Sequence, residues 1–318
     1  MSQPLVTIGL TTYNAADSVK KAITSALSQT WRPIEILICD DCSSDDTPDI
    51  VSKMATIHPE IRLLRNEINS GVATSRNQII KEARGEYIAF FDDDDESVPD
   101  RITMQINRII TYEKEFSNGA PVICHTARQV IYPDGTERIE HTMGECTGSS
   151  APSGLAVAQR ILMGTPLIDG NGACPTCSQM ARTCTYRDLG GFDAAFRRGE
   201  DTELNIRLAL AGGHFTGIGE PLVRQSMTKS SDKSLNDEHR YMLNIMKKHR
   251  DIMEAAGQYV FCLRWLKSKQ VWLKGERLKF CFYLTQLIFT HPILTTRRLK
   301  EAAPNLALNR AFRKFHDI

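Results

Sequence analysis

Short apolar runs alternate with segments of helical periodicity through the first third of the chain. The apolar runs are rich in Ile, Leu, Val and Phe and have the length of buried strands. They lie at residues 5–10, 34–39, 61–64 and 87–91. Apolar residues recur every three to four positions between these runs, which predicts helices at 19–27, 46–57, 72–83 and from residue 99. This alternation predicts an α/β fold in which helices cover both faces of a mostly parallel central sheet.

The middle of the chain has a less regular pattern. Residues 122–132 form a strand-like run, and Pro133-Asp134-Gly135 follows as a turn, so we expect a hairpin. Residues 140–153 are polar and rich in Gly and Ser, which is typical of a surface loop. Farther on, we expect a strand at 178–183 and helices at 154–163, at 201–211 and, as one long charged helix, at 235–256.

Composition places the chain among globular proteins. Of its 318 residues, 42% are hydrophobic and 24% are charged, which excludes disordered, collagen-like and disulfide-scaffold proteins. The net charge of +1 gives no general attraction to nucleic acid. No apolar run reaches the length of about 18 residues that a membrane-spanning helix needs. The N-terminal residues do not resemble a secretory leader and the nine cysteines are an odd number, so we expect a cytoplasmic protein with reduced thiols.

Charge is distributed unevenly along the chain. Residues 258–318 carry 12 Lys and Arg against 3 Asp and Glu, a net of +9, so residues 1–257 carry a net of −8. The change at Gly257 predicts a domain at 1–257, with halves 1–110 and 111–257, and a basic helical tail at 258–318. Basic and aromatic residues interleave in the tail, as in amphipathic helices that lie in anionic membrane interfaces. A helical subdomain or a dimer contact would explain the same composition.

Acidic residues follow two of the expected parallel strands. Asp40-Asp41 ends the second strand, and Asp92-Asp93-Asp94-Asp95 ends the fourth. Ligands of open α/β sheets bind beyond the carboxyl ends of the strands, so we expect both groups at one crevice. Carboxylates this close repel one another, which favours a divalent cation among them and a substrate with phosphate groups. One aspartate pair alone could instead serve as a turn former or a helix cap.

Five segments, spread in order over about residues 4–110, resemble the family 2 glycosyltransferases. They are 6–14 (VTIGLTTYN), 25–30 (SALSQT), 35–45 (EILICDDCSSD), 69–77 (NSGVATSRN) and 85–95 (GEYIAFFDDDD), with Pro99-Asp100-Arg101 close behind. The resemblance implies a GT-A fold and the inverting transfer of a sugar from a nucleotide-diphosphate donor, most of all a UDP-sugar.

The resemblance assigns donor-binding roles to individual residues. Thr11 and Tyr13 match the loop that packs around the nucleotide base. Asp41 matches the aspartate that hydrogen-bonds the uracil ring. Arg76 matches an arginine near the nucleotide, where its planar fork suits an anionic ligand. An ion pair on a helix surface is the alternative for Arg76.

The aspartate run matches the DXD motif of the family. The match implies that Asp92 and Asp93 lie near the ribose and that Asp94 binds Mn²⁺ or Mg²⁺ between the diphosphate oxygens. A second resemblance, in the later half of the chain, includes the pair Glu200-Asp201. Asp201 matches the catalytic base, which takes the proton of the acceptor hydroxyl, with Glu200 beside it. Both carboxylates could also stabilise the N-terminus of the helix that follows them.

One feature departs from the family pattern. Many relatives have an Arg/His-containing loop after the base that closes over the diphosphate, whereas the corresponding segment of this chain has no histidine. Arg224, Lys229 or Lys233 would then supply the positive charge, unless the loop is only solvated.

Cys174 and Cys177 have the spacing of zinc ligands, but no second such pair is present, so we expect them to form a pocket wall near the acceptor.

These features predict a glycosyltransferase that moves a sugar from a nucleotide-sugar donor to a saccharide or lipid-linked saccharide acceptor. The predicted setting is cell-surface polysaccharide biosynthesis at the inner face of the plasma membrane, with the tail on the membrane surface. No nucleic-acid motif accompanies the basic tail, and the phosphate-loop, nucleophile-elbow and HExxH motifs are missing. Two alternatives remain: a sugar nucleotidyltransferase, and a non-catalytic nucleotide-sugar or polysaccharide-binding protein.

Overall fold

The computed structural model describes residues 3–227 and 235–302. The chain forms two compact units. The first unit comprises Met1–Ala158 and Leu167–Thr228, and the second unit comprises Gln159–Pro166 and Lys229–Ile318. The later boundary between the units, at Thr228 and Lys229, comes before Gly257 in the sequence. The expected boundary between domain and tail was placed at Gly257, where the charge changes. The separate roles assigned to that domain and tail stay predictions.

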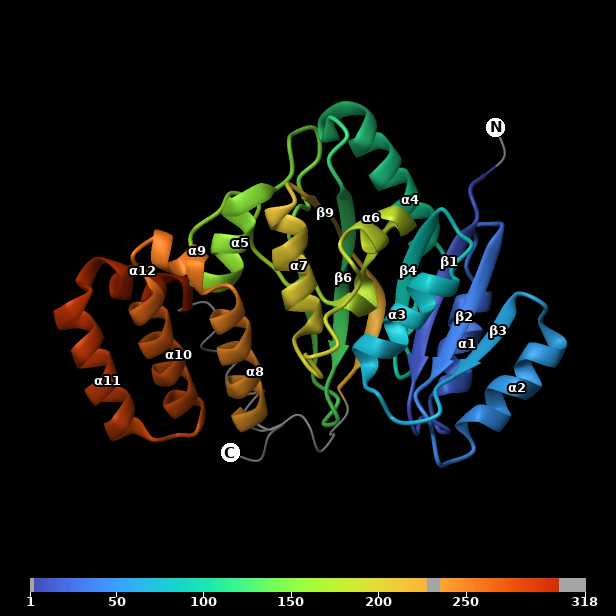
Figure 1. Ribbon diagram of the computed structural model, residues 1–318, viewed down its shortest axis with the longest axis horizontal. Helices are drawn as coiled ribbons and strands as arrows, with labels where there is room; N and C mark the ends of the chain where they lie inside the picture. Colours follow the sequence, from blue (N-terminus) through green and yellow to red (C-terminus); the bar gives the residue numbers. More distant parts are fainter. Residues whose placement is uncertain (1–2, 228–234, 303–318) are drawn as a thin grey trace. The chain divides into compact units, whose positions relative to one another are not determined.

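The first unit is built on one sheet (Figure 1). Its strands are β1 (Val6–Thr12), β2 (Ile34–Asp40), β3 (Ile61–Arg65), β4 (Tyr87–Asp92), β5 (Glu96–Ser97), β6 (Val122–Ile131), β7 (Glu137–Glu140), β8 (Met180–Arg182) and β9 (His214–Ser226). They lie in the order β3-β2-β1-β4-β8-β6-β9-β5, and β7 pairs with β6. The four strands β1 to β4 are parallel to one another, which confirms the predicted α/β fold, and β6 and β7 form the predicted hairpin.

The later half of the sheet mixes strand directions. β8 is antiparallel to both β4 and β6, whereas β6 and β9 are parallel. The sequence pattern did not predict β9, because Gly217, Gly219 and Pro221 interrupt its apolar residues. The pairing of β6 with β9 shifts register on either side of Ala127, opposite this interruption. The three-residue strand β8 lies between β4 and β6, and so connects the parallel strands β1 to β4 with β6 and β9.

Helices cover both faces of the sheet, as predicted (Figure 1). The first unit contains α1 (Val19–Leu27), α2 (Thr47–Ile57), α3 (Val72–Glu82), α4 (Arg101–Tyr112), α6 (Thr183–Asp188) and α7 (Glu200–Leu210), and α5 (Gly154–Met163) runs from the first unit into the second. Residues of α1, α2 and α4 share one buried core with alternate residues of β1, β2 and β4. On the opposite face, Ile79 of α3 lies against Gly9 of β1, and Tyr186 of α6 packs edge-on against Phe90 of β4.

A fully buried arginine anchors the carboxyl end of β4. Arg101 is the first residue of α4, and its guanidinium donates a hydrogen bond to the carbonyl of Phe90 at 2.9 Å. It donates two more, to Ser97 Oγ at 2.9 Å and to Gln105 Oε1 at 3.1 Å. Burial lowers the pKa of Arg101 to about 10, so the guanidinium stays charged at neutral pH. These bonds fix the acidic turn between β4 and β5.

The described part of the second unit is helical (Figure 1). Besides the end of α5, it contains α8 (Leu235–Lys248), α9 (Arg250–Ala255), α10 (Tyr259–Leu273), α11 (Arg277–Thr290) and α12 (Pro292–Ala302). The prediction of one helix at 235–256 is wrong, because the backbone leaves helical geometry at His249 (φ −108°, ψ 33°) and separates α8 from α9. α10 contacts α8, α9 and α11, and α11 contacts α12. None of the helices in the described ranges is long and apolar enough to cross a bilayer.

Candidate functional site

The strand register brings the acidic strand ends together, as the sequence predicted. β1 lies between β2 and β4, with Thr12 opposite Asp40 and Thr11 opposite Asp92. Asp41 follows directly after β2. Because the three strands are parallel and end at the same edge of the sheet, aspartates from two distant segments flank the end of β1.

One buried arginine connects this edge to the later half of the sequence. Arg76 of α3 donates hydrogen bonds to Glu200 Oε1 at 2.6 Å and to Asp92 Oδ1 at 3.1 Å. Its side chain is only 6% exposed, and its guanidinium lies 5.4 Å from the ring centre of Phe192. Arg76 is therefore not an ion pair on a helix surface. It joins the donor-side and acceptor-side segments identified by the family resemblance, and we call Arg76, Asp92 and Glu200 the arginine cluster.

The charges of the arginine cluster depend on one another. Burial opposes the charge of Arg76, but the carboxylates of Asp92, Glu200 and Asp201 outweigh burial and raise the pKa of Arg76 above its ordinary value. Burial raises the pKa of Glu200 despite the attraction of Arg76, and Asp201 raises it further. The guanidinium is thus the group that keeps a negative charge on Glu200 tolerable inside the protein.

The chain itself engages both oxygens of Asp41. Oδ1 accepts hydrogen bonds from Asn66 Nδ2 at 2.7 Å and from the N–H of Ser70 at 3.0 Å, and Oδ2 accepts one from the N–H of Gly71 at 2.7 Å. Gly71 directly precedes α3 and has a φ of +88°, which favours glycine. Asp41 therefore fixes the start of the helix that carries Arg76. Its predicted contact with a uracil ring stays a prediction.

The remaining donor-binding candidates lie at the same edge. Thr11 is buried near the end of β1, whereas the side chain of Tyr13 is exposed. The N–H of Tyr13 donates a hydrogen bond to Asp93 Oδ2 at 3.2 Å. Burial, together with the negative charge of Asp94, raises the pKa of Asp93 to about 7. A cation bound at the acidic turn would relieve this repulsion.

A group of possible metal ligands adjoins the acidic turn. Asp92, Asp95 and Cys177 each have a ligand atom within 4.8 Å of those of the other two. Oδ2 of Asp95 is buried and has no hydrogen-bond partner among the described residues. A buried carboxylate oxygen without a donor fits a divalent cation, so the carboxylates of Asp92 and Asp95 suit the metal that the family implies, whereas burial raises the pKa of the Cys177 thiol and keeps it protonated. Asp95 and Cys177 were not among the predicted ligands, and Asp94, which was, lies in the same turn.

Glu200 and Asp201 form the first turn of α7. Gly199, the residue before them, has a φ of +75°, a left-handed conformation that favours glycine. Oδ1 of Asp201 accepts a hydrogen bond from the N–H of Thr202 at 2.6 Å. Negative charge at the N-terminus of a helix is stabilising, so Glu200 and Asp201 also stabilise the start of α7, which was the alternative role considered for them. The role of Asp201 in proton transfer is compatible with it and stays a prediction.

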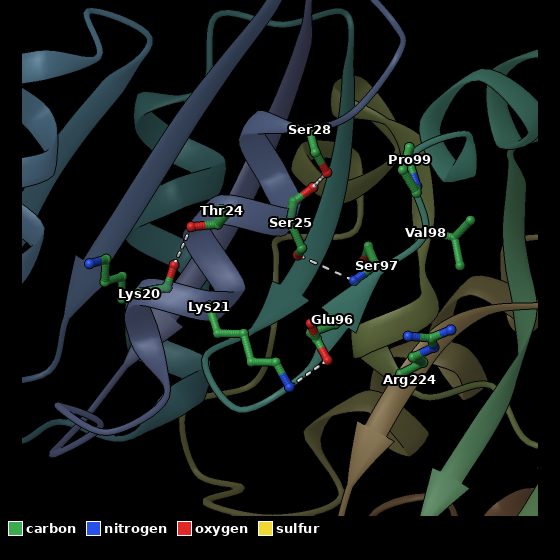
Figure 2. Close-up of a pocket in the computed structure, with 10 residues that line it drawn as sticks. All are labelled: Lys20, Lys21, Thr24, Ser25, Ser28, Glu96, Ser97, Val98, Pro99 and Arg224. Carbon is green, nitrogen blue, oxygen red and sulfur yellow. Dashed lines mark hydrogen bonds and ion pairs between the residues drawn. The ribbon is translucent and has the colours of Figure 1, made fainter.

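Arg224 lines a hollow that includes none of the predicted site residues. It lies on β9 opposite Glu96 of β5, and the hollow, of about 560 Å³, is completed by residues of α1 (Figure 2). Lys21 of α1 pairs with Glu96 at 2.6 Å, as Figure 2 shows. The structure therefore gives no support for Arg224 as the residue that closes over a diphosphate. Lys229 and Lys233, the other two candidates, lie outside the described residues.

Known proteins resemble the part of the chain that carries the parallel sheet edge and the acidic turn. Residues 7–150 match the model of Glycosyl transferase family 2. The chain is 43% identical over 113 residues to UDP-Glc:alpha-D-GlcNAc-diphosphoundecaprenol beta-1,3-glucosyltransferase WfaP of Escherichia coli, which covers 36% of this chain and 44% of that protein. It is 42% identical over 105 residues to the succinoglycan biosynthesis protein ExoO of Rhizobium meliloti, with 33% and 30% covered. The chain thus spans less than half the length of these two relatives.

The fold extends the likeness beyond the matched sequence. The crystal structure of S. aureus TarS 1-349 in complex with UDP-GlcNAc superimposes with a TM-score of 0.60, at 15% identity, over 98% of this chain and 90% of that chain. At this identity the likeness concerns the fold alone. Residues 7–150 are thus similar to glycosyl transferase family 2, and the fold is the GT-A fold that the resemblance implied.

Proposed function

We propose that the chain transfers a sugar from a nucleotide-diphosphate donor, first of all a UDP-sugar, to a saccharide or lipid-linked saccharide acceptor in cell-surface polysaccharide biosynthesis. The arginine cluster carries this proposal, because it connects the acidic turn after β4 to the first turn of α7. WfaP is named for a UDP-Glc donor and a diphosphoundecaprenol-linked acceptor, and TarS was crystallised with UDP-GlcNAc. Both relatives support this class of donor.

In this proposal the donor lies at the edge formed by β1, β2 and β4. The exposed ring of Tyr13 would contact the base, and Asp41 would accept a hydrogen bond from uracil. Asp94 would hold Mn²⁺ or Mg²⁺ together with Asp92 or Asp95. When bound, the ion would neutralise charge on the leaving diphosphate. Arg76 would act as a positioning residue, since it holds Asp92 by a direct hydrogen bond.

Proton transfer would come from the first turn of α7. An inverting transferase needs one carboxylate to take the proton of the acceptor hydroxyl as that oxygen attacks the anomeric carbon. Asp201 would take this role, with Glu200 held beside it by Arg76. No covalent intermediate is formed in a single displacement, so a second catalytic carboxylate is not required.

A thermal-shift panel of nucleotide sugars, with and without Mn²⁺, tests the donor site. The correct donor at 100 times its Kd is expected to raise Tm by about 5 °C, because it binds the folded state only. Asp94→Ala is expected to abolish the metal-dependent part of this shift. Asp49→Ala, which changes an exposed aspartate in the first turn of α2, is expected to retain it. The proposal is contradicted if no nucleotide sugar shifts Tm.

Product analysis separates the proposal from its two alternatives. Release of free nucleoside diphosphate indicates glycosyl transfer, whereas release of pyrophosphate indicates nucleotidyl transfer. Donor binding without release of either product, across a panel of saccharide acceptors, indicates a non-catalytic binding protein.

We also propose that α11 contacts a membrane surface. Leu278, Phe282 and Phe289 are 88%, 61% and 83% exposed, respectively. Leu287 is the buried residue of this helix, which the structure describes over its whole length. Arg277 at the start of α11 is also exposed. Large apolar side chains in water beside basic ones match an interface between water and anionic lipid.

Vesicle co-sedimentation measures this contact. We expect the chain to bind vesicles that contain anionic phospholipid and to bind neutral vesicles more weakly. The triple variant Leu278→Ser/Phe282→Ser/Phe289→Ser is expected to lose about 100-fold or more in partitioning, because each of the three side chains contributes about 1–2 kcal/mol when buried. The control Ile57→Ser/Ile68→Ser changes exposed apolar residues of the first unit and should bind normally. Equal binding by both variants would rule out α11 as the contact.

A further inference from the structure

The second unit contains a cavity whose lining is both apolar and positively charged. The cavity has a volume of about 660 Å³ and lies among residues of α10, α11, α12 and the end of α5. Its apolar wall consists of Trp265, Trp272, Leu273, Phe280, Leu284 and Leu299. Its charged residues are Arg160, Lys269, Arg298 and Glu301. We call it the tail cavity. Its size is that of a small-molecule site, and none of its residues belongs to the site described above.

The tail cavity has two cations in excess of its anions. Glu301 pairs with Arg160 at 2.8 Å. Neither Lys269 nor Arg298 forms an ion pair within residues 3–227 and 235–302. Glu238, which does not line the cavity, is the carboxylate that partly offsets the charge of Lys269. The tail cavity is therefore short of negative charge.

Both excess cations are poorly solvated. Burial lowers the pKa of Lys269, and the charge of Arg298 lowers it further. The side chain of Lys269 keeps accessible surface and lines the cavity. Burial also lowers the pKa of Arg298. Each cation would gain from an anion that replaces the water it has lost.

Two contacts place the guanidinium of Arg298 at the wall of the tail cavity. The Arg298 guanidinium lies 5.5 Å from the ring centre of Trp265. It passes so close to Gly164 that a side chain at that position would collide with it. The hydroxyl of Ser268 is buried at the cavity wall and has no hydrogen-bond partner in the described part of the chain. Ser268 is thus a free donor close to the cations in sequence and in the same wall.

We propose that the tail cavity binds a membrane lipid that carries a phosphate group. The phosphate would lie between Lys269 and Arg298, with the Ser268 hydroxyl as a further donor, and the hydrocarbon chain would follow the tryptophans and leucines. A neutral lipid would leave two desolvated cations uncompensated, and free phosphate would leave the apolar wall in contact with water. The site would bind its lipid whether or not the chain transfers sugar.

Tryptophan fluorescence reports on the tail cavity directly. Trp265 and Trp272 line it, and Trp31, the third tryptophan of the chain, lies in the first unit. Dihexanoyl phosphatidic acid, kept below its micelle concentration, is expected to change the emission of the full chain saturably. Inorganic phosphate and dihexanoyl glycerol are each expected to bind at least about tenfold more weakly, because each satisfies only half of the cavity. Without vesicles in the assay, surface binding through α11 does not contribute.

Single substitutions locate the binding. Lys269→Gln and Arg298→Gln are each expected to weaken binding of the phosphatidic acid by about tenfold, whereas Arg297→Gln, the neighbouring arginine that does not line the cavity, should bind as the parent does. Lys269→Gln removes a poorly solvated charge and should not lower Tm, so the test stays decisive if Arg298→Gln unfolds. Saturable binding with this pattern supports the proposal. Absence of binding, equal binding of phosphate or of the diacylglycerol, or equal losses in Arg297→Gln would each overturn it.

Discussion

Replacing Arg76 by methionine is expected to lower the free energy of unfolding by about 3–5 kcal/mol, the cost of removing one partner from a buried ion pair. The cost comes from the partner that remains. Glu200 is buried, and its pKa is already raised by burial with the guanidinium 2.6 Å away. Without Arg76 the carboxyl must take up a proton or draw water into the core, and Asp92 loses the donor that holds it. Urea denaturation measures the loss.

Two variants give this prediction its controls. Lys21→Met removes a cation that is 2.6 Å from Glu96 but largely exposed, so a change below about 1 kcal/mol is expected. Adding Glu200→Gln to Arg76→Met is expected to restore part of the stability, because the amide leaves no uncompensated charge. If Arg76→Met costs no more than Lys21→Met, the arginine cluster is not a buried ion pair in solution.

The elements that the sequence predicted best are those whose pattern is local. The strands β1, β2 and β4 are buried over nearly their whole length because helices cover both faces of the sheet, and the helices between them are apolar on one face only. β9 was not predicted because Gly219 and Pro221 interrupt its apolar residues. The strand forms nevertheless, because its pairing with β6 shifts register at this interruption. The break between α8 and α9 at His249 was also missed, because the sequence has no Gly or Pro there.

The sequence likewise predicted some features of the candidate site and missed others. A rule about strand ends was enough to bring Asp41 and Asp92 to one edge, because neighbouring parallel strands end together. The family resemblance singled out Arg76 and Glu200, but not their contact, since 124 residues separate them. The approach of Cys177 to the acidic turn depends on how the chain returns through β8, which no local pattern encodes.

Asp201→Asn is expected to slow the release of nucleoside diphosphate from the donor by about 10²–10⁴-fold, the contribution of a well-placed general base. Donor binding, measured by thermal shift, should stay unchanged, because the proposed donor contacts lie on the strand ends. The asparagine keeps an oxygen that can accept the N–H of Thr202, so α7 loses only the negative charge at its start. That charge is worth about 0.3–1 kcal/mol at a helix N-terminus, too little to unfold the chain.

Glu203→Gln provides the matched control in the same turn of α7. Glu203 is fully buried and pairs with Arg207 at 2.8 Å, so its replacement should lower Tm while each folded molecule turns over at the normal rate. Asp201→Asn should show the opposite pattern, with Tm nearly unchanged and turnover lost. A near-normal rate for Asp201→Asn would remove Asp201 as the base. Glu200, which Arg76 holds by a direct hydrogen bond, would be the next carboxylate in that turn, and Glu200→Gln would then be expected to lose turnover.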